Sequence, residues 1–219
     1  MSSFVDIHTH SHRYNENIIS VFSLRVGVDD DFPPHYPFSF GIHPWDAGTI
    51  DFNKVEMDRL LKYQPVAVGE IGLDFLHNHN TRNTQISLFR QQLEFAQQHQ
   101  LPVIIHSVRT LHDVLKILKL YPSLTAIFHG FIGNRMQAAN ILTLGHSISL
   151  GPAALRSPKT LDALTVIPYK YLFLESDNSL SDIRILYASI ASKLGVSTEF
   201  LCNQLYLNYS NIFNIHGNP

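Results

Sequence analysis

The feature that most constrains the fold of this chain is a regular alternation of short apolar runs with longer helical stretches, clearest from residue 38 onward. Strands that alternate with helices favour a parallel sheet, and about eight strands in about 220 residues favour a TIM-like (β/α) barrel. An open doubly wound sheet is the rival, but no Gly-rich phosphate loop follows the first apolar run. The predicted strands are Phe4–His8, Ile18–Val26, Phe38–Ile42, Val66–Gly69, Pro102–Ile105, Leu124–Phe128, Ser147–Leu150 and Tyr171–Leu174.

The region after the first strand departs from this alternation. Ile18–Val26 follows after only a short polar segment, whereas a parallel crossover takes about a dozen residues or more. It is therefore either antiparallel or part of an abbreviated second βα unit that lacks its helix. We expect an α/β fold, a slightly truncated TIM-like barrel, in a single domain over residues 1–219. Helical periodicity places helices at Phe52–Tyr63, Thr81–Gln100, Leu111–Leu120, Met136–Leu144 and Lys159–Leu164, and in a tail Ile183–Phe213 broken at Gly195 and near Asn208.

Composition excludes several classes of protein. The single Cys202 rules out an internal disulfide framework and a cysteine-based zinc site. No apolar run approaches the ~18 residues of a membrane helix, and the N-terminus does not resemble a signal peptide. A net charge of −2 argues against extensive non-specific binding along a phosphate backbone. We expect a soluble cytoplasmic protein with no membrane contact, and a monomer is favoured.

Six polar residues stand at the ends of apolar runs and are candidate metal ligands. His8 and His10 are two residues apart, so they project from one face of a strand. In a parallel barrel the carboxyl ends of the strands meet at one face, where ligands from different strands converge. Four imidazoles and two carboxylates suit two divalent ions, with Mg²⁺, Mn²⁺, Zn²⁺ and Fe²⁺ all possible. The alternatives are buried core histidines and carboxylates paired with Arg or Lys. The six are His8, His10, Glu70, His106, His129 and Asp177.

These residues fall in motifs that resemble the TatD family of metal-dependent hydrolases, a branch of the amidohydrolase-like barrels. The motifs occur in the family's order between residues 4 and 177, and the tail 208–213 resembles its closing motif. They are Asp6-Ile7-His8-Thr9-His10, Gly41-Ile42-His43-Pro44-Trp45, Gly69-Glu70-Ile71-Gly72-Leu73-Asp74, Pro102-Val103-Ile104-Ile105-His106-Ser107, Phe128-His129-Gly130-Phe131 and Glu175-Ser176-Asp177.

The resemblance implies a deoxyribonuclease that hydrolyses phosphodiester bonds at single-stranded or frayed DNA ends with an activated water. It implies that His8 and His10 hold one metal, His106 and His129 a second, and that Glu70 bridges them. Asp177 is then a ligand and the catalytic base, with Glu70 as the other catalytic residue. The sequence departs from the family in its short segment between His10 and Gly41, in Val108 and Arg109 after His106, in the Ser-Asp-Asn sequence at Asp177, and in Asn211 in the closing motif.

Other residues bear on the substrate. We predict substrate contacts from His43, Trp45, Arg109 and Arg135, although His43 could serve only a tight turn and Asp74 is read as structural. Cations in the loops that follow strands could attract phosphates: Arg13, Arg82, Arg109, Arg135, Arg156 and Lys159. Aromatic residues in similar loops could stack on a base: Tyr14, Trp45, Phe75 and Phe131. The remaining histidines are read as surface or loop residues: His12, His35, His77, His79, His99, His112, His146 and His216.

Two other functions are open at this point. The same ligands could hydrolyse a carboxylic ester or amide, such as an aminoacyl ester or a lactone, because amidohydrolase-like barrels use nearly the same set. A mouth ringed by cations would favour phosphate, and a narrow apolar mouth the carbonyl substrate. The non-enzymatic alternative is a metal-binding protein, against which the complete set of six ligands argues.

Overall fold

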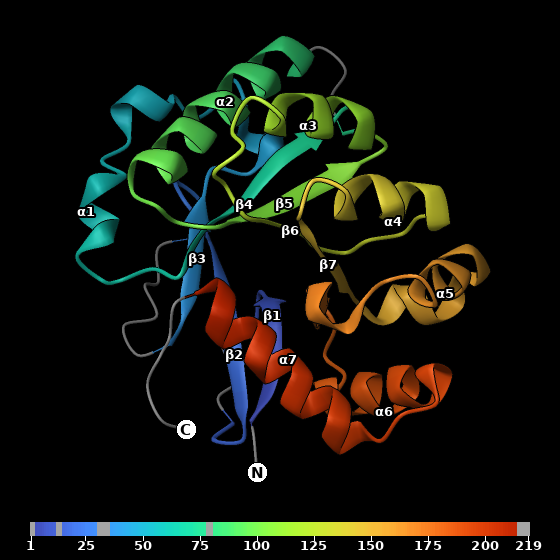
Figure 1. Cartoon of the computed structure of the whole chain (residues 1–219). Coiled ribbons are helices and arrows are strands. Elements are labelled where there is room, and N and C mark those ends of the chain that lie inside the picture. Colours follow the sequence, from blue (N-terminus) through green and yellow to red (C-terminus); the bar gives the residue numbers. More distant parts are fainter. Residues whose placement is uncertain (1–2, 12–14, 30–35, 78–80, 214–219) are drawn as a thin grey trace. The chain divides into compact units, whose positions relative to one another are not determined.

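The computed structural model describes residues 3–11, 15–29, 36–77 and 81–213 (Figure 1). The chain divides into two compact units. Unit 1 comprises Met1–Phe22 and Ile127–Pro219, and unit 2 comprises Ser23–Ala126. The second strand, β2 (Ile18–Arg25), and the sixth, β6 (Ala126–Phe128), run across the two boundaries.

The strands of unit 1 are parallel. β1 (Phe4–Thr9) pairs with β2, and β6, β7 (Ser147–Leu150) and β8 (Leu172–Leu174) pair in order. A parallel bridge between Thr9 and Asp177 joins the end of β1 to the segment after β8. β1 therefore pairs on both sides at its carboxyl end, which is where the candidate ligands His8 and His10 stand.

A bulge in β1 decides which side chains share a face. Asp6 is opposite Ser20 and Thr9 is opposite Phe22, so β1 uses three residues where β2 uses two. The extra residue places Asp6 and Thr9 on the same face of the ladder as Ser20. His8 and His10 then lie on the opposite face. They share that face, as their spacing of two residues predicts.

Helices of unit 1 pack along these strands. They are α4 (Arg135–Leu142), α5 (Pro158–Leu164), α6 (Ile183–Leu194) and α7 (Thr198–Ile212), with 3₁₀ helices at Pro152–Arg156 and Tyr169–Tyr171. Figure 1 shows α6 and α7 beside β1, and both helices contact this strand. The buried hydroxyl of Tyr187 in α6 donates to the C=O of Val5 (2.8 Å) and accepts from its N–H (3.1 Å). α6 thus anchors the strand that carries His8 and His10.

Unit 2 contains three parallel strands in order, β3 (Phe38–Gly41), β4 (Ala67–Asp74) and β5 (Val103–Val108). Its helices are α1 (Asp58–Leu61), α2 (Arg82–Gln98) and α3 (Leu111–Leu118), with 3₁₀ helices at Pro44–Asp46 and Phe52–Lys54. Gln92 of α2 holds the end of β3 by donating to the C=O of Ile42 (3.0 Å) and accepting from its N–H (2.7 Å).

Three sequence predictions require correction. Glu70 and His106 lie inside their strands, because β4 and β5 stay paired as far as Asp74 and Val108. The helix predicted over Phe52–Tyr63 is only a 3₁₀ turn and the four-residue α1. α7 continues through Asn208 because that side chain, buried against the segment before β8, donates to the C=O groups of Tyr169 (2.7 Å) and Leu172 (2.9 Å).

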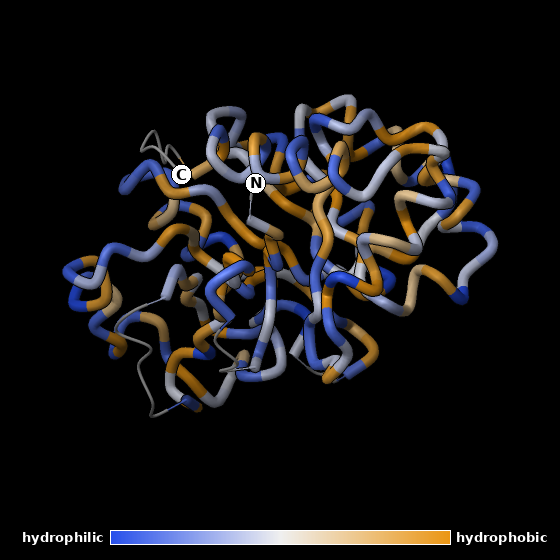
Figure 2. Tube along the Cα trace, turned by 90° about the horizontal axis from the view of Figure 1, so that it is seen from below, coloured by the Kyte–Doolittle hydropathy of each residue, from blue (hydrophilic) through white to orange (hydrophobic). Residues whose placement is uncertain are grey.

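The prediction of an abbreviated second βα unit without a helix is confirmed, and its strand is parallel to β1, not antiparallel. β1 and β2 are parallel although only residues 10–17 connect them, and the described part of that connection contains no helix. Apolar and polar residues alternate in short stretches along the chain (Figure 2). None of the helices in the described part of the chain is long and apolar enough to cross a membrane.

Candidate functional site

One group of predicted ligands lies in unit 1, where β1 ends and the chain leaves β8. Asp177 Oδ1 is 3.6 Å from His10 Nε2 and 4.0 Å from His8 Nε2. One ligand atom from each residue lies within 4.8 Å of the other two. The His8 side chain is fully buried, whereas those of His10 and Asp177 are 29% and 40% exposed. Two imidazoles and a carboxylate at this separation fit one divalent ion that substrate and water can reach.

The backbone holds Asp177 in a strained conformation. Its φ of +52° lies in the left-handed region, which costs a non-glycine residue roughly 1–3 kcal/mol. The N–H of Asp177 donates to the C=O of His8 (3.0 Å), and the N–H of His10 donates to the C=O of Asp177 (3.2 Å). Asp6 fixes the preceding Ser176 by accepting from its N–H (2.8 Å) and its O–H (2.6 Å). Burial raises the pKa of Asp6 to about 7, although both hydrogen bonds from Ser176 oppose the shift.

His129 is oriented by a carboxylate that sequence reasoning did not single out. Its Nδ1 is 3.2 Å from Oε1 of the buried Glu175, which also accepts from the N–H of Gly130 (2.7 Å). With the Nδ1 hydrogen donated to Glu175, Nε2 carries the lone pair that a metal ion requires. Burial alone would raise the pKa of Glu175, but His129, together with His8 and Ser149, outweighs burial and holds the pKa below its usual range. The rings of His8 and His129 are 4.3 Å apart, so His129 belongs to the same group.

A second group of ligands lies in unit 2. Glu70 Oε1 is 2.5 Å from His106 Nδ1 and 3.4 Å from His43 Nε2, and all three residues are buried. One ligand atom from each lies within 4.8 Å of the others, so these three also fit a divalent ion. Burial lowers the pKa of His43, although Glu70 opposes this shift. The lowered pKa favours the neutral imidazole, which is the form that binds metals. The structure thus places His43, predicted as a substrate contact, among predicted metal ligands.

Asp74 connects this second group to an exposed aromatic residue. It lies 3.4 Å from His106 Nε2 and accepts from the indole N–H of Trp45 (2.8 Å). The hydrogen bond with His106 and that with Trp45 hold the pKa of Asp74 well below its usual range. Trp45 is 43% exposed and stacks on His77, with ring centroids 4.5 Å apart. Asp74 therefore holds both a predicted ligand and a predicted substrate contact.

The predicted cations are not all available to a substrate. Arg135 forms two hydrogen bonds with Asp162, at 2.8 and 2.7 Å, and Arg82 pairs with Asp113 at 3.3 Å. Their charges are partly offset, which weakens the expectation of a cationic ring. Arg109 is exposed, in the loop between β5 and α3, with a φ of +55°. Its role, like that of Arg135, stays a prediction.

Other predicted substrate contacts differ in exposure. Phe131 is buried, with 8% of its surface exposed, so the prediction that it could stack on a base is wrong. The half-buried Phe75 lies under the Arg82 guanidinium, 4.5 Å from ring to Cζ. Arg156 lines a pocket of about 240 Å³ in unit 1, and Lys159 lies in the first turn of α5.

The histidines predicted to be surface or loop residues also differ in exposure. His112 is exposed, while His146, in the loop before β7, is buried beside Phe128. Burial lowers the pKa of His146 to about 4. Several predicted residues lie outside the described part of the chain: His12, Arg13, Tyr14, His35, His79 and His216.

Comparison with known proteins identifies a family that the chain matches. Residues 26–214 match the family model described as TatD related DNase. An uncharacterized metal-dependent hydrolase of Escherichia coli, YjjV, is 35% identical over 71% of this chain, and the alignment takes in 62% of that relative. The chain thus spans less than two thirds of that relative's length. A 3′-5′ ssDNA/RNA exonuclease, TatD of Klebsiella pneumoniae, is 30% identical over 81% of this chain and 77% of its own length.

Solved structures establish the fold class. The crystal structure of YjjV, described as a TatD homologue from Escherichia coli, aligns with a TM-score of 0.82 over 96% of this chain and 98% of that one, at 23% identity. A hydrolase of the TatD family from Entamoeba histolytica aligns with a TM-score of 0.79 over 96% and 98%, at 17% identity. The described residues contain eight strands, helices separate successive strands from β3 onward, and the predicted TIM-like (β/α) barrel is confirmed.

Proposed function

The chain belongs to the TatD related DNase family, and we propose that it is a metal-dependent hydrolase that cleaves phosphodiester bonds at the ends of DNA strands. The observation that carries the proposal is the group of His8, His10 and Asp177, whose ligand atoms lie within 4.8 Å of one another. The family match spans residues 26–214 and so draws on both units, which supports treating residues 1–219 as one catalytic domain.

We propose metal-ligand roles for the same residues that the sequence singles out. In unit 1, His8, His10, His129 and Asp177 would hold metal. In unit 2, Glu70 and His106 would do so, and the proximity of His43 to both adds it to the candidates. A bound divalent ion supplies Lewis-acid stabilisation of a phosphate and lowers the pKa of a water. That two ions share Glu70 stays a prediction, as does the identity of the metal.

The chain's own groups would perform the proton transfer and the orientation. Asp177 is exposed enough to take a proton from a water at Oδ1, since 40% of its side chain is accessible. The strained turn that holds Asp177 fixes its direction, and Glu175 fixes the ring of His129. Trp45 offers an exposed aromatic surface at which a base could stack.

The substrate class rests on the relatives. The Klebsiella relative is described as a 3′-5′ ssDNA/RNA exonuclease, and a zebrafish relative, 27% identical, as a putative deoxyribonuclease. We therefore propose a single-stranded or frayed end as the substrate. Arg82 and Arg135 pair with carboxylates, which weakens the electrostatic argument for a phosphate substrate. Hydrolysis of a carboxylic ester or amide is therefore kept as an alternative outcome of the test.

The test is cleavage of end-labelled single-stranded DNA by protein stripped of metal with a chelator and then supplied with Mg²⁺, Mn²⁺, Zn²⁺ or Fe²⁺. We expect trimming from one end that depends on the added metal. Asp177→Asn should reduce the rate by about 100- to 10,000-fold, the usual range for loss of a general base. The matched control is Asp58→Asn, in an exposed carboxylate of α1, which should leave the rate unchanged.

Metal binding measured by calorimetry separates the two parts of the proposal. Protein that binds divalent metal but cleaves no DNA with any ion would overturn the nuclease assignment, and aminoacyl esters and lactones would then be assayed. Wild-type metal affinity in the double variant His8→Ala/His10→Ala would overturn the assignment of the ligands themselves.

A further inference from the structure

An exposed stack of two aromatic rings lies beside the ligand group of unit 2. The rings of Trp45 and His77 are nearly parallel, with 15° between their planes and 4.5 Å between their centroids. Both residues are exposed. Two rings stacked at the surface bury less apolar area than rings in the core, so stability alone gives little reason for this arrangement.

One carboxylate holds both residues of the stack. Oδ2 of the buried Asp74 accepts from the indole N–H of Trp45 (2.8 Å), and its Oδ1 accepts from the backbone N–H of His77 (3.2 Å). Asp74 is itself fixed at the end of β4, where Gln85 of α2 donates to its C=O (2.9 Å) and accepts from its N–H (2.8 Å). The stack is therefore held from a strand and a helix, and such preorganisation lowers the entropy lost on binding.

The same carboxylate connects the stack to the candidate metal ligands. Asp74 Oδ2 is 3.4 Å from His106 Nε2. The indole ring of Trp45 also packs edge to face with the rings of His43 and His106, with centroids 4.7 and 6.2 Å apart. A group stacked on these rings therefore lies close to the place where the unit 2 ligands would hold a metal ion.

The accessible end of this stack belongs to His77. One face of the His77 ring is against Trp45, and the ring makes no hydrogen bond, ion pair or second ring contact with any residue of the described ranges. Trp45, by contrast, is covered by His77 on one face and has the guanidinium of Arg25 over its ring, with Cζ 5.6 Å from the centroid. Asp46 holds that guanidinium by two hydrogen bonds, at 2.6 and 2.7 Å. A planar group can therefore extend the stack at His77 without displacing a residue.

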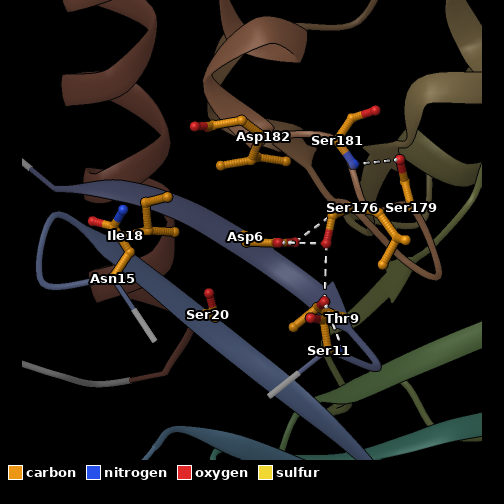
Figure 3. A pocket seen from close by; sticks show the side chains of 12 residues that line it. Asp6, Thr9, Ser11, Asn15, Ile18, Ser20, Ser176, Ser179, Ser181 and Asp182 are labelled. Atoms are coloured by element: carbon orange, nitrogen blue, oxygen red, sulfur yellow. Dashed lines mark hydrogen bonds between the residues drawn. The ribbon is translucent and has the colours of Figure 1, made fainter. Parts of the chain in front are cut away.

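The polar pocket of unit 1 is lined by residues of another kind. It has a volume of about 270 Å³ and opens on the face of the β1–β2 ladder opposite to His8 and His10 (Figure 3). Hydroxyl and carboxyl groups line it, among them those of Asp6, Thr9 and Ser176. None of the described residues at this pocket is aromatic or cationic. They provide neither a ring on which a base could stack nor a charge that would attract a phosphate.

We propose that His77 is the residue on which a base of the substrate strand stacks, with Trp45 as the layer beneath it. The inference rests on the proposed function, because it takes a phosphate of that strand to be held at the ligand group of unit 2. Stacking recognises the flat face that every base presents, so the contact carries little preference for one base over another. It favours single-stranded DNA, because a base of a duplex would first have to leave its neighbours. His77, which the sequence predicts to be a surface or loop residue, is thereby a substrate contact.

The fluorescence of Trp45 provides the test, because Trp45 is the only tryptophan in the chain. The probe is hexadeoxyadenylate, added with Mg²⁺ to full-length Asp177→Asn protein, in which the unit 2 ligands are intact and cleavage is slow. We expect saturable quenching of Trp45 fluorescence as this parent protein binds the strand. Adding His77→Ala should raise the Kd about 5- to 100-fold, the usual range for loss of one base–aromatic contact. His77→Phe, which keeps a flat ring, should restore the Kd to near that of the parent.

Two controls distinguish stacking from other roles of His77. His112→Ala, in an exposed histidine of α3, should leave the Kd of the parent unchanged. A six-residue deoxyribose phosphate strand without bases should bind equally well to the parent and to His77→Ala. Weaker binding of this base-free strand by His77→Ala would assign His77 to the phosphates and overturn the stacking. Tighter binding of hexadeoxyadenylate by His77→Ala would mean that a base replaces His77 on Trp45, which also overturns it.

The outcomes separate this inference from the proposed function. Binding that is weakened in His77→Ala and restored in His77→Phe supports the stack even if no metal ion restores DNA cleavage. Metal-dependent cleavage of DNA with a wild-type KM in the single variant His77→Ala overturns the stack and leaves the nuclease assignment intact. Absence of any quenching by hexadeoxyadenylate in the parent overturns the stack whatever the result for cleavage.

Discussion

Burial of His146 predicts that the fold loses stability as the pH falls from about 6.5 toward about 4. The side chain is 5% exposed, and its ring lies 6.1 Å from that of Phe128. Burial lowers the pKa of His146 from 6.5 to about 4. Between these values the unfolded chain binds a proton at this position and the folded chain does not. The free energy of unfolding therefore falls with pH through this window.

The magnitude follows from the size of the shift. One pKa unit is worth about 1.4 kcal/mol, so the full effect of His146 is on the order of 3 kcal/mol, reached below about pH 4. By about pH 5 roughly 2 kcal/mol of this is lost relative to about pH 7.5. Above about pH 7 the contribution is constant, because the imidazole is neutral in both states.

Urea denaturation of metal-stripped protein at a series of pH values measures this effect. The informative quantity is the difference in pH dependence between wild type and His146→Phe, since contributions of the other histidines cancel. We expect the variant to lose about 2 kcal/mol less than wild type between about pH 7.5 and about pH 5. The matched control, His112→Phe, replaces an exposed histidine of α3 and should keep the wild-type slope. An unchanged slope in His146→Phe would refute the assignment.

Two further predictions concern groups buried in unit 1. Tyr187→Phe removes the hydroxyl that bonds both the N–H and the C=O of Val5, and should lower the free energy of unfolding by about 1–3 kcal/mol in urea denaturation. The same change in the half-buried Tyr206 is the control, and equal losses would contradict the assignment. Glu175→Ala removes the carboxylate that orients His129, and calorimetry with Mn²⁺ should show metal affinity reduced by about 10- to 100-fold. Wild-type affinity in that variant would exclude an orienting role for Glu175.

The sequence predicts the strands more reliably than their ends. Ser147–Leu150 matches β7 residue for residue, because a buried run there is bounded by clear turn residues. β4, by contrast, continues beyond Gly69, where the sequence predicts its end, as far as Asp74. Gly72 and Asp74 resemble turn residues in the sequence, and only the pairing with β5 keeps them in the strand. Local pattern cannot reveal where a partner strand ends.

Helix limits failed for a related reason. Phe52–Tyr63 has helical periodicity, yet only Phe52–Lys54 and Asp58–Leu61 are helical. Asn208 resembles a helix breaker, yet it lies within α7 because its amide donates to the C=O groups of Tyr169, before β8, and of Leu172, the first residue of β8. At Asn208 these tertiary contacts override intrinsic propensity.

Part of the candidate site follows from local sequence, and part depends on contacts between residues far apart in the chain. His8 and His10 are two residues apart in one strand, and their common direction follows from the sequence alone. Glu175 and Asp177 have the same spacing, and that spacing alone does not distinguish them; only the family resemblance singles out Asp177. The structure separates them, because the φ of +52° at Asp177 turns the chain where β8 ends. Glu175 is fully buried against His129, 46 residues away, while Asp177 is 40% exposed. A carboxylate that accepts bonds from a buried imidazole orients a ligand, and one that faces solvent beside two imidazoles can meet metal and water. Their different roles depend on that turn.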